Sequence, residues 1–276
     1  MQISGTTKLY GIIGYPVEYS LSPLMHNTAF EALGENRVYV PLQTKNVKAA
    51  IIGMRGLNIR GVSVTHPHKE QVMELLDEID PVAQKIGSVN TVAAREKAGR
   101  SWLYGTNTDW MGLNQALTDY TELKGKKAVI LGAGGAAKAI GFGLQEEGVT
   151  VTIKSRTESR GRQLAEQLEC PWISLYDEPE ESADILINTT SVGMKPNSEA
   201  SPIESAWLSG YQVVMDIVYA PLKTKLLGEA EAAGCICVNG LEMLLYQGVA
   251  QFELWTGVKA PVDVMRDALH SVIDPS

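Results

Sequence analysis

The segment Gly132-Ala133-Gly134-Gly135-Ala136-Ala137 has the residue types and spacing of a phosphate-binding turn. It follows the apolar run 128–131, which is typical of a buried strand, and it opens a stretch with helical character. Glycines at the first and third positions let the backbone turn tightly and approach a phosphate closely, and the helix that follows directs its free N–H groups at the anion. Many glycine strings match this pattern by chance. Here a strand precedes the string and a helix follows it, so we predict a dinucleotide site.

The next strand predicts which dinucleotide is bound. Sites for NAD usually end this strand on an acidic residue that binds the ribose 2′-hydroxyl. In this chain the strand 149–153 is followed by Lys154 and Arg156, with Arg160 one helical turn later and no acid at the strand end. Guanidinium groups suit a doubly charged 2′-phosphate, so the sequence predicts NADP rather than NAD. The alternative interpretation is that these basic residues form a solvated surface turn.

Polar segments in the N-terminal part have the composition of a site for a small polar molecule. Ser20 and Ser22 precede Pro23 in the pattern of a helix start with Ser22 as its cap, although two hydroxyls at a helix N-terminus also suit a carboxylate. In Thr65-His66-Pro67-His68-Lys69 the two histidines lack a third ligand at useful spacing, so we expect no metal there. The segment 105–109 places small hydrogen-bonding residues before a helix, which a turn and a cap would also explain.

Apolar periodicity predicts alternating strands and helices, and hence an α/β protein. In the N-terminal part the expected strands are 9–14, 38–42, 61–65, 90–94 and 102–104, and the expected helices are 22–33 (stopped by Gly34), 47–54, 70–76 and 109–120. From residue 126 the pattern becomes doubly wound, with strands at 128–131, 149–153, 184–188, 213–217 and 236–238. A long apolar helical segment, 241–255, is expected to pack back onto the first domain.

Composition excludes several classes of protein. A length of 276 residues suits two modest domains or one large one, and a net charge of -8 argues against nucleic acid or an anionic membrane as partner. No apolar stretch is long enough to cross a bilayer, and no leader is recognisable. Of the three cysteines, Cys235 and Cys237 alternate on an expected strand, so we interpret them as small buried hydrophobes rather than metal ligands or a disulfide, and we expect a cytoplasmic protein.

Taken together, the motifs resemble those of the shikimate dehydrogenases, and the resemblance covers the whole chain. The similar segments run in the family's order: 20–27 (SLSPLMHN), 64–69 (VTHPHK), 87–91 (GSVNT), 105–109 (GTNTD), the glycine loop, 155–157 (SRT), 188–194 (NTTSVGM), 216–219 (DIVY) and 239–248 (NGLEMLLYQG). The resemblance implies an N-terminal α/β substrate-binding domain, an NADP-binding Rossmann domain and a C-terminal helix that returns to the first domain. We place these parts at 1–109, 110–240 and 241–276.

The resemblance also implies an activity, the reversible NADPH-dependent reduction of 3-dehydroshikimate to shikimate on the way to aromatic amino acids. It assigns Lys69 and Asp109 as the catalytic pair. The implied substrate-binding residues are Ser20 and Ser22 for the carboxylate, and Thr65, Asn90, Asp109 and Gln247 for the ring hydroxyls, with Tyr219 nearby. The implied cofactor-binding residues are Gly132, Gly134, Gly135, Ala136, Ala137, Ser155, Arg156, Thr157, Arg160, Gly240 and Met243.

At two positions the chain departs from the family pattern, which usually has asparagine in place of Ser63 and Ser155. Ser63 shortens a polar side chain near the substrate, and Ser155 removes an amide beside the adenosine ribose, for which Lys154 could substitute. The nearest alternative is therefore a quinate or dual quinate/shikimate dehydrogenase. A catalytically idle NADP-binding paralogue and a methylene-tetrahydrofolate dehydrogenase are more distant alternatives. A homodimer is one candidate for the assembly.

Overall fold

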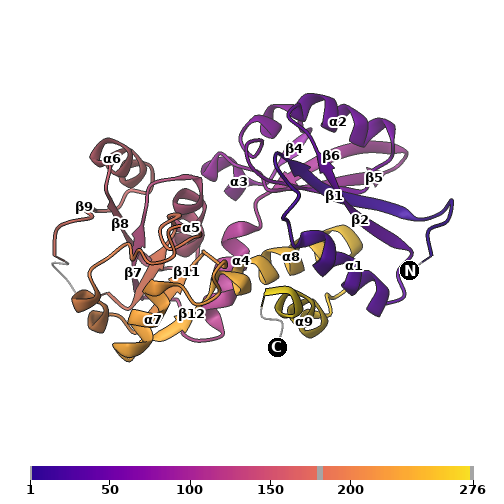
Figure 1. The fold of residues 1–276 in the computed structure, drawn as a ribbon. Coiled ribbons are helices and arrows are strands. Elements are labelled where there is room, and N and C mark those ends of the chain that lie inside the picture. Colours follow the sequence, from indigo (N-terminus) through magenta and orange to yellow (C-terminus); the bar gives the residue numbers. More distant parts are fainter. Residues whose placement is uncertain (1, 179–182, 274–276) are drawn as a thin grey trace. The chain divides into compact units, whose positions relative to one another are not determined.

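The chain divides into two compact units, each built around its own six-stranded sheet. A computed structural model describes residues 2–178 and 183–273. The first unit comprises Met1–Thr108 and Gln247–Ser276, and the second comprises Asp109–Tyr246. Both units mix helices and strands, which confirms the α/β prediction (Figure 1).

The first unit contains a mixed sheet. Its strands are β1 (Lys8–Gly14), β2 (Arg37–Gln43), β3 (Gly61–Val64), β4 (Glu78–Ile79), β5 (Thr91–Lys97) and β6 (Arg100–Thr106). They lie in the order β2-β1-β3-β5-β6-β4, and β5 runs antiparallel to both of its neighbours. The helices are α1 (Ser22–Ala32), α2 (Val47–Gly56), the 3₁₀ helix η1 (Gln71–Leu75), α3 (Pro81–Ile86), the C-terminal part of α8 (Gly240–Thr256) and α9 (Val262–Ile273). Figure 1 shows α2 on one side of this sheet and α1 with α9 on the other.

Aromatic packing joins α1 and α8 to the first sheet. The ring centroids of Tyr10 and Trp255 are 5.6 Å apart, and those of Phe30 and Phe252 are 5.2 Å apart. Trp255 donates its indole N–H to the Val92 carbonyl at 3.1 Å, and its ring lies directly on Gly61. A Cβ atom at Gly61 would come within 2.4 Å of Trp255 Nε1, so only glycine permits this contact.

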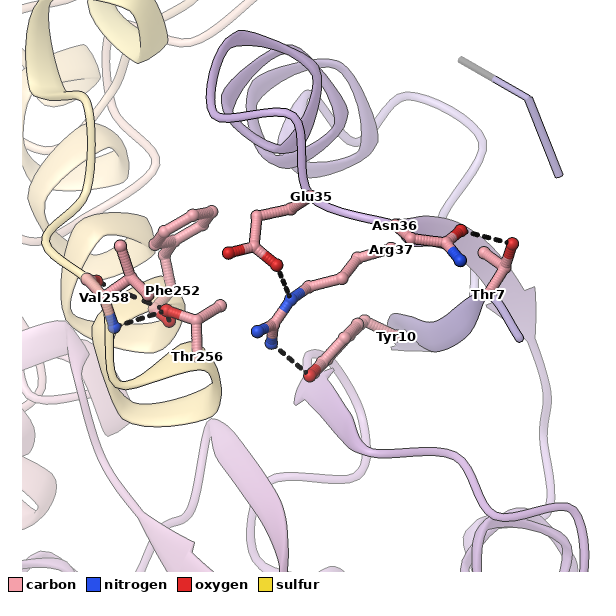
Figure 2. A network of polar contacts seen from close by, with 8 residues as sticks. All are labelled: Thr7, Tyr10, Glu35, Asn36, Arg37, Phe252, Thr256 and Val258. Atoms are coloured by element: carbon pink, nitrogen blue, oxygen red, sulfur yellow. Dashed lines mark hydrogen bonds and ion pairs between the residues drawn. The ribbon is translucent and has the colours of Figure 1, made fainter. Parts of the chain in front are cut away.

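Arg37 adds a buried polar contact between β1 and β2. Figure 2 shows its side chain between the Glu35 carboxylate, 2.8 Å from Nε, and the Tyr10 hydroxyl, 2.9 Å from a terminal guanidinium nitrogen. Arg37 is only 8% exposed, and these two hydrogen bonds offset part of the cost of burying its guanidinium. This network belongs to the framework of the first unit.

The second unit contains a wholly parallel sheet. Its strands are β7 (Lys127–Leu131), β8 (Thr150–Ser155), β9 (Trp172–Ser174), β10 (Ile185–Asn188), β11 (Val213–Asp216) and β12 (Ile236–Val238), in the order β12-β11-β10-β7-β8-β9. The helices are α4 (Asp109–Thr118), α5 (Gly135–Glu146), α6 (Glu158–Gln167), η2 (Ser205–Gly210), α7 (Lys225–Ala232) and the start of α8. The winding direction reverses between β7 and β10, and ligands of such sheets bind outside the strand ends at this point.

Apolar clusters cover both faces of the second sheet. One contains residues of α4, α5 and α6, and the other contains residues of η2 and α7. Cys235 is buried in the second cluster and Cys237 packs against it, and both thiols are free, as expected. Among the described residues, no helix is both long enough and apolar enough to span a membrane.

The segment 70–76 contains a helix as expected, although it is the 3₁₀ helix η1. One local prediction is wrong, because Ser22 does not cap α1. The N-cap is Leu21, which has no side-chain cap hydrogen bond, and Ser22 is the first helical residue. Gly34, with φ +65°, follows the end of α1 as expected. The short strands β4 and β9 and the short helix α3 were not predicted, because two to six residues carry too little periodicity.

Candidate functional site

The glycine loop lies between β7 and α5 at the reversal point of the second sheet. Gly132 has φ +117°, and a Cβ atom there would lie 2.7 Å from Thr189 Oγ1, so both its conformation and its surroundings require glycine. A Cβ atom at Gly134 or Gly135 would meet nothing within 4 Å. The N-cap Gly134 is extended and makes no side-chain cap bond. The first turn of α5 therefore offers backbone N–H groups beside open space, which fits a pyrophosphate.

Small side chains continue the loop into α5. Ala136 is half-buried, while Ala137 is fully buried and belongs to the apolar cluster between α5 and the sheet. The helix thus packs closely on β7, as predicted for this segment.

Exposed basic side chains follow β8. Arg156, Thr157 and Arg160 are all exposed, and no ion pair involves either arginine within residues 2–178 and 183–273. Glu158, the acidic residue of this stretch, pairs with Arg162 at 2.8 Å. Two free guanidinium groups at the end of this strand fit a 2′-phosphate better than a ribose hydroxyl.

Lys154 does not belong to this exposed group, so its predicted contribution is wrong. Its side chain is fully buried, with Nζ 2.5 Å from the Asp177 carbonyl oxygen and 4.4 Å from the centre of the Trp207 ring. Burial lowers the pKa of this ammonium group. The parallel sheet is covered on both faces, so alternate side chains of β8 enter protein on either side. The Lys154 side chain consequently points toward the face of the sheet that η2 covers, and not toward the turn that contains Arg156.

Ser155 is also buried, at 4% exposure, and its hydroxyl oxygen accepts a hydrogen bond from Trp172 Nε1 at 2.9 Å. The same hydroxyl lies 3.3 Å from the Thr157 carbonyl oxygen, to which it donates. Its side chain is thus used within the protein, and the exposed polar groups of this turn are those of Arg156, Thr157 and Arg160.

Polar side chains at the ends of β10 and β11 hold the neighbouring loops. Asp216 is fully buried and accepts hydrogen bonds from Asn188 Nδ2 (2.9 Å), Thr224 Oγ1 (2.7 Å) and the Val218 amide (3.0 Å). Burial raises the pKa of its carboxyl group to about 6. Asn188 Oδ1 in turn accepts from the amide and the hydroxyl of Thr190. The loop that contains Tyr219 therefore starts from a rigid anchor.

The start of α8 contacts the same strand end. A Cβ atom at Gly240 would lie 2.3 Å from the Ile217 carbonyl oxygen, so glycine allows the helix to begin there. Met243, one turn later, is half-buried and packs against the apolar cluster that contains α5. Tyr219 is half-buried, and burial raises the pKa of its phenol.

In the first unit, Ser20 and Ser22 both lie at the N-terminus of α1. Ser22 is 5% exposed, and its backbone N–H donates to Ser20 Oγ at 3.3 Å. The two hydroxyls, at the positive end of the helix dipole, could donate to a carboxylate.

A chain of buried hydrogen bonds runs within the first unit from β2 to Thr108. Tyr39 Oη donates to Ser63 Oγ (2.6 Å), and Ser63 Oγ donates to Gln251 Oε1 (2.8 Å). Gln251 Nε2 donates to Thr91 Oγ1 (2.9 Å), which donates to Asn90 Oδ1 (2.6 Å). Asn90 Oδ1 also accepts from the Thr108 amide (2.7 Å). Asp109, the first residue of α4, follows directly.

Lys69 lies on the connection between β3 and η1, and this connection is held at several points. The Lys69 carbonyl accepts from the Val89 amide at 2.8 Å, next to Asn90. Thr65, half-buried at the end of β3, donates its amide to the Ile13 carbonyl. His68 is 1% exposed, and its Nε2 donates to the Thr44 carbonyl at 2.8 Å, so this histidine has a structural role.

The comparisons with known proteins agree from end to end. Family models match residues 12–92 (shikimate dehydrogenase substrate binding domain), 114–217 (shikimate / quinate 5-dehydrogenase) and 240–270 (shikimate 5'-dehydrogenase C-terminal domain). The chain is 45% identical to the shikimate dehydrogenase (NADP(+)) of Methanothermobacter thermautotrophicus, over 99% of both chains. The chain belongs to the shikimate dehydrogenase family.

Solved structures support the same membership. A shikimate dehydrogenase in complex with NADP+ is 40% identical, with a TM-score of 0.88 over 99% of this chain and 98% of that one. The shikimate dehydrogenase of Thermus thermophilus, in complex with NADP(H) and shikimate, is 37% identical, with a TM-score of 0.87 over 96% of this chain and 99% of that one.

Seen as a shikimate dehydrogenase family member, the chain contains polar residues that sequence reasoning did not single out. Gln251 lies one helical turn after Gln247 on α8, and this spacing puts both amides on one face of the helix. Asp216 was recognised only as part of the segment 216–219 and was given no role, although an acidic residue that ends a buried strand is a recognisable signal. Tyr39 gave no such signal, because an aromatic residue in a strand usually packs in the core. In the described part of the chain, no three His, Cys, Asp or Glu side chains are grouped to hold a metal ion.

Proposed function

We propose that this chain catalyses the reversible NADPH-dependent reduction of 3-dehydroshikimate to shikimate, in the pathway to chorismate and the aromatic amino acids. Family membership and the names of its full-length relatives support the reaction. One structural observation carries the cofactor preference. A glycine loop at the switch point of a parallel sheet is accompanied by two exposed arginines, and no acid, at the end of the adjacent strand.

We assign the pyrophosphate to the backbone of the glycine loop, Gly132, Gly134, Gly135, Ala136 and Ala137. We assign the adenosine 2′-phosphate to Ser155, Arg156, Thr157 and Arg160. Ser155 would contribute its main chain, because its hydroxyl is hydrogen-bonded to Thr157 and Trp172. We assign the nicotinamide end to Gly240 and Met243. When bound, NADPH supplies the hydride for the C3 ketone.

We assign the substrate carboxylate to the hydroxyls of Ser20 and Ser22, which lie at the N-terminus of α1. Thr65, Asn90, Asp109 and Gln247 would bind the ring hydroxyls, with Tyr219 as a further contact. The hydrogen-bond chain from Tyr39 through Ser63 and Gln251 supports this assignment, because it holds the Asn90 side chain in place.

Lys69 and Asp109 form the proposed catalytic pair. Reduction of the ketone develops negative charge on its oxygen, which then requires a proton. The Lys69 ammonium donates this proton or stabilises the oxyanion, and the Asp109 carboxylate orients the lysine and holds the neighbouring C4 hydroxyl. In the reverse direction the same groups accept the proton from shikimate.

The domain roles follow from these assignments. Residues 1–109 would bind substrate and carry out catalysis, 110–240 would bind NADP, and 241–276 would complete the first part through α8 and α9. The compact units, with boundaries after Thr108 and Tyr246, are compatible with this division. We also propose a cytoplasmic enzyme that assembles as a homodimer, and sedimentation of the purified protein would test the assembly.

The nearest competing function is quinate oxidation, since quinate has an extra hydroxyl where shikimate has its ring double bond. Ser63 is the relevant position, because the family usually has asparagine there. In this chain its hydroxyl is shared between Tyr39 and Gln251. Ser20, Ser22 and Thr65 are all retained, which favours shikimate.

The decisive experiment follows the absorbance of reduced nicotinamide with shikimate or quinate, each offered with NADP or NAD. Turnover mainly with shikimate and NADP is the expected result. Preference for quinate or NAD would reassign the protein to the sister activity. Folded protein that is inactive with all four combinations would contradict the proposed reaction and favour an idle NADP-binding paralogue.

A further inference from the structure

The end of β8 is fixed from both faces of the sheet. On one face, the Ser155 hydroxyl accepts the Trp172 indole N–H at 2.9 Å. On the other, the buried Lys154 ammonium donates to the Asp177 carbonyl at 2.5 Å and lies over Trp207. Ladder pairing of Ser155 with Ser174 adds support from β9. Arg156 therefore emerges from a strand end whose backbone has little freedom.

Helix α6 lies directly against the same Trp172–Ser155 pair. A Cβ atom at Gly161 would come within 2.0 Å of Trp172 Nε1 and within 2.2 Å of Ser155 Oγ. The helix backbone thus touches the pair, with no side chain between them. Arg160 immediately precedes Gly161, so this contact also fixes the point from which Arg160 extends. Figure 1 shows α6, β8 and β9 together at one edge of the second sheet.

Trp172 is held on its ring face as well as through its N–H. The Arg162 guanidinium carbon lies 4.5 Å from the ring centroid, and Arg162 is itself paired with Glu158 at 2.8 Å. Arg162 is thereby engaged in holding the indole. Arg156 and Arg160 are exposed and have no ion pair in the described ranges, so they remain available for an anion.

We propose that Trp172 is a positioning residue for recognition of the 2′-phosphate. The hydrogen-bonded pair of Trp172 and Ser155, together with the Gly161 backbone packed against it, is called the latch below. The latch sets the distance between the main chain at Arg156 and the main chain at Arg160. Guanidinium recognition of phosphate oxygens depends on geometry. Two arginines whose main-chain positions are fixed before binding lose less conformational freedom when the phosphate binds. The inference rests on the proposed function, because it requires NADP at this site.

The test uses calorimetric titration of the full-length protein with 2′,5′-ADP and with 5′-AMP, which differ only in the 2′-phosphate. Trp172→Phe removes the indole N–H and keeps a ring for Arg162, while Ser155→Ala removes the acceptor. Each variant should weaken 2′,5′-ADP binding by about three- to tenfold, the worth of one hydrogen bond, and change 5′-AMP binding less than about twofold. Because both variants break the same bond, the double variant should be no weaker than either single one.

Trp102→Phe is the matched control, since this indole also donates a hydrogen bond, to Glu78 at 2.9 Å, but belongs to the first unit. It should leave both titrations unchanged. Variants that weaken both ligands equally would overturn the latch, because they would show general packing of the adenosine site. Unchanged affinity for 2′,5′-ADP would also overturn it. Wild-type protein that binds both ligands equally would instead overturn the NADP clamp of the proposed function, and the latch with it.

Discussion

Lys69 extends from a connection that is rigid for reasons unrelated to its own side chain. The Val89 amide holds its carbonyl, and the neighbouring His68 ring is fastened to Thr44. An ammonium group on such a base can be aimed with little loss of freedom, which suits stabilisation of charge that appears only during the reaction.

Lys69→Ala should therefore lower kcat by about 10²–10⁴-fold, the usual worth of a general acid, while NADPH binding persists. Steady-state kinetics and an NADPH titration monitored by protein fluorescence would measure the two effects. Lys48→Ala, at an exposed position of α2, is the control and should retain full turnover. Near-normal kcat in the Lys69 variant would remove this residue from the catalytic pair.

The proposed role of Arg156 concerns the cofactor and not the proton transfer. Arg156→Gln removes one charged hydrogen-bond partner of the 2′-phosphate and should reduce NADPH affinity by about 1.5–3 kcal/mol, with NADH affinity nearly unchanged. Titrations of both cofactors measure this difference directly, with Arg100→Gln in β6 as an exposed control. Equal losses for NADPH and NADH would argue against a 2′-phosphate contact.

At the scale of elements, strands β3 and β5 of the first unit are fastened to α8 through one close contact. Gly61 begins β3, and Trp255 covers it while donating to Val92 of β5. The helix that contains Gln247 and Gln251 is thus seated on the sheet by Trp255, one helical turn after Gln251. Packing at Trp255 and orientation of Gln251 are consequently linked through one rigid helix.

Gly61→Ala should destabilise the first unit by about 1–3 kcal/mol, because the new methyl group must displace the indole. Chemical denaturation would measure this change. Gly53→Ala on α2 is the matched control, since a Cβ atom there meets nothing within 4 Å. It should stabilise the helix by up to about 1 kcal/mol. A Gly61 variant as stable as wild type would mean that Trp255 moves aside at no cost.

The sequence was most informative where an element has a strong period and a distinctive boundary. The parallel strands of the second unit and the glycine loop are examples, because a continuous apolar run and a glycine turn each have a single good structural explanation. Lys154 shows the opposite case, since its exposure depends on which helices cover β8, and a strand pattern contains no such information. The Trp172–Ser155 bond joins residues from different strands, and without the sheet order neither residue indicates the other.

At the scale of the whole molecule, stability in acid depends on groups that are buried in an uncharged form. His26 is fully buried against Tyr39, with ring centroids 4.5 Å apart, and its ring nitrogens have no hydrogen-bond partner among the described residues. Burial lowers the pKa of His26 from 6.5 to about 3. Below pH 6.5 the His26 imidazole therefore binds a proton in the unfolded chain but stays neutral in the folded chain.

The stabilising effect of neutral His26 is fully present above pH 6.5 and is lost as the pH falls toward 3. The loss of this effect should lower the free energy of unfolding by roughly 2 kcal/mol as the pH falls from 6.5 to about 5. His26→Phe should flatten this dependence, which denaturation at several pH values would show. Asp216, whose pKa is raised to about 6, makes the folded state more stable as the pH falls. This contribution is the same in the wild type and in the His26→Phe variant, so it cancels when their pH curves are compared. Parallel pH curves for the two proteins would contradict the assignment.

The aromatic cluster around Trp255 also gives the first unit an optical signature. Tyr10 and Tyr39 lie 5.6 and 6.0 Å from this indole, distances at which an excited tyrosine passes its energy to tryptophan before it can emit. Folding of the first unit should therefore extinguish the emission of these two phenols, and unfolding should restore it. Because both donors and the acceptor belong to the first unit, the emission recovered from these two phenols would report on that unit alone, even while the second unit remains folded.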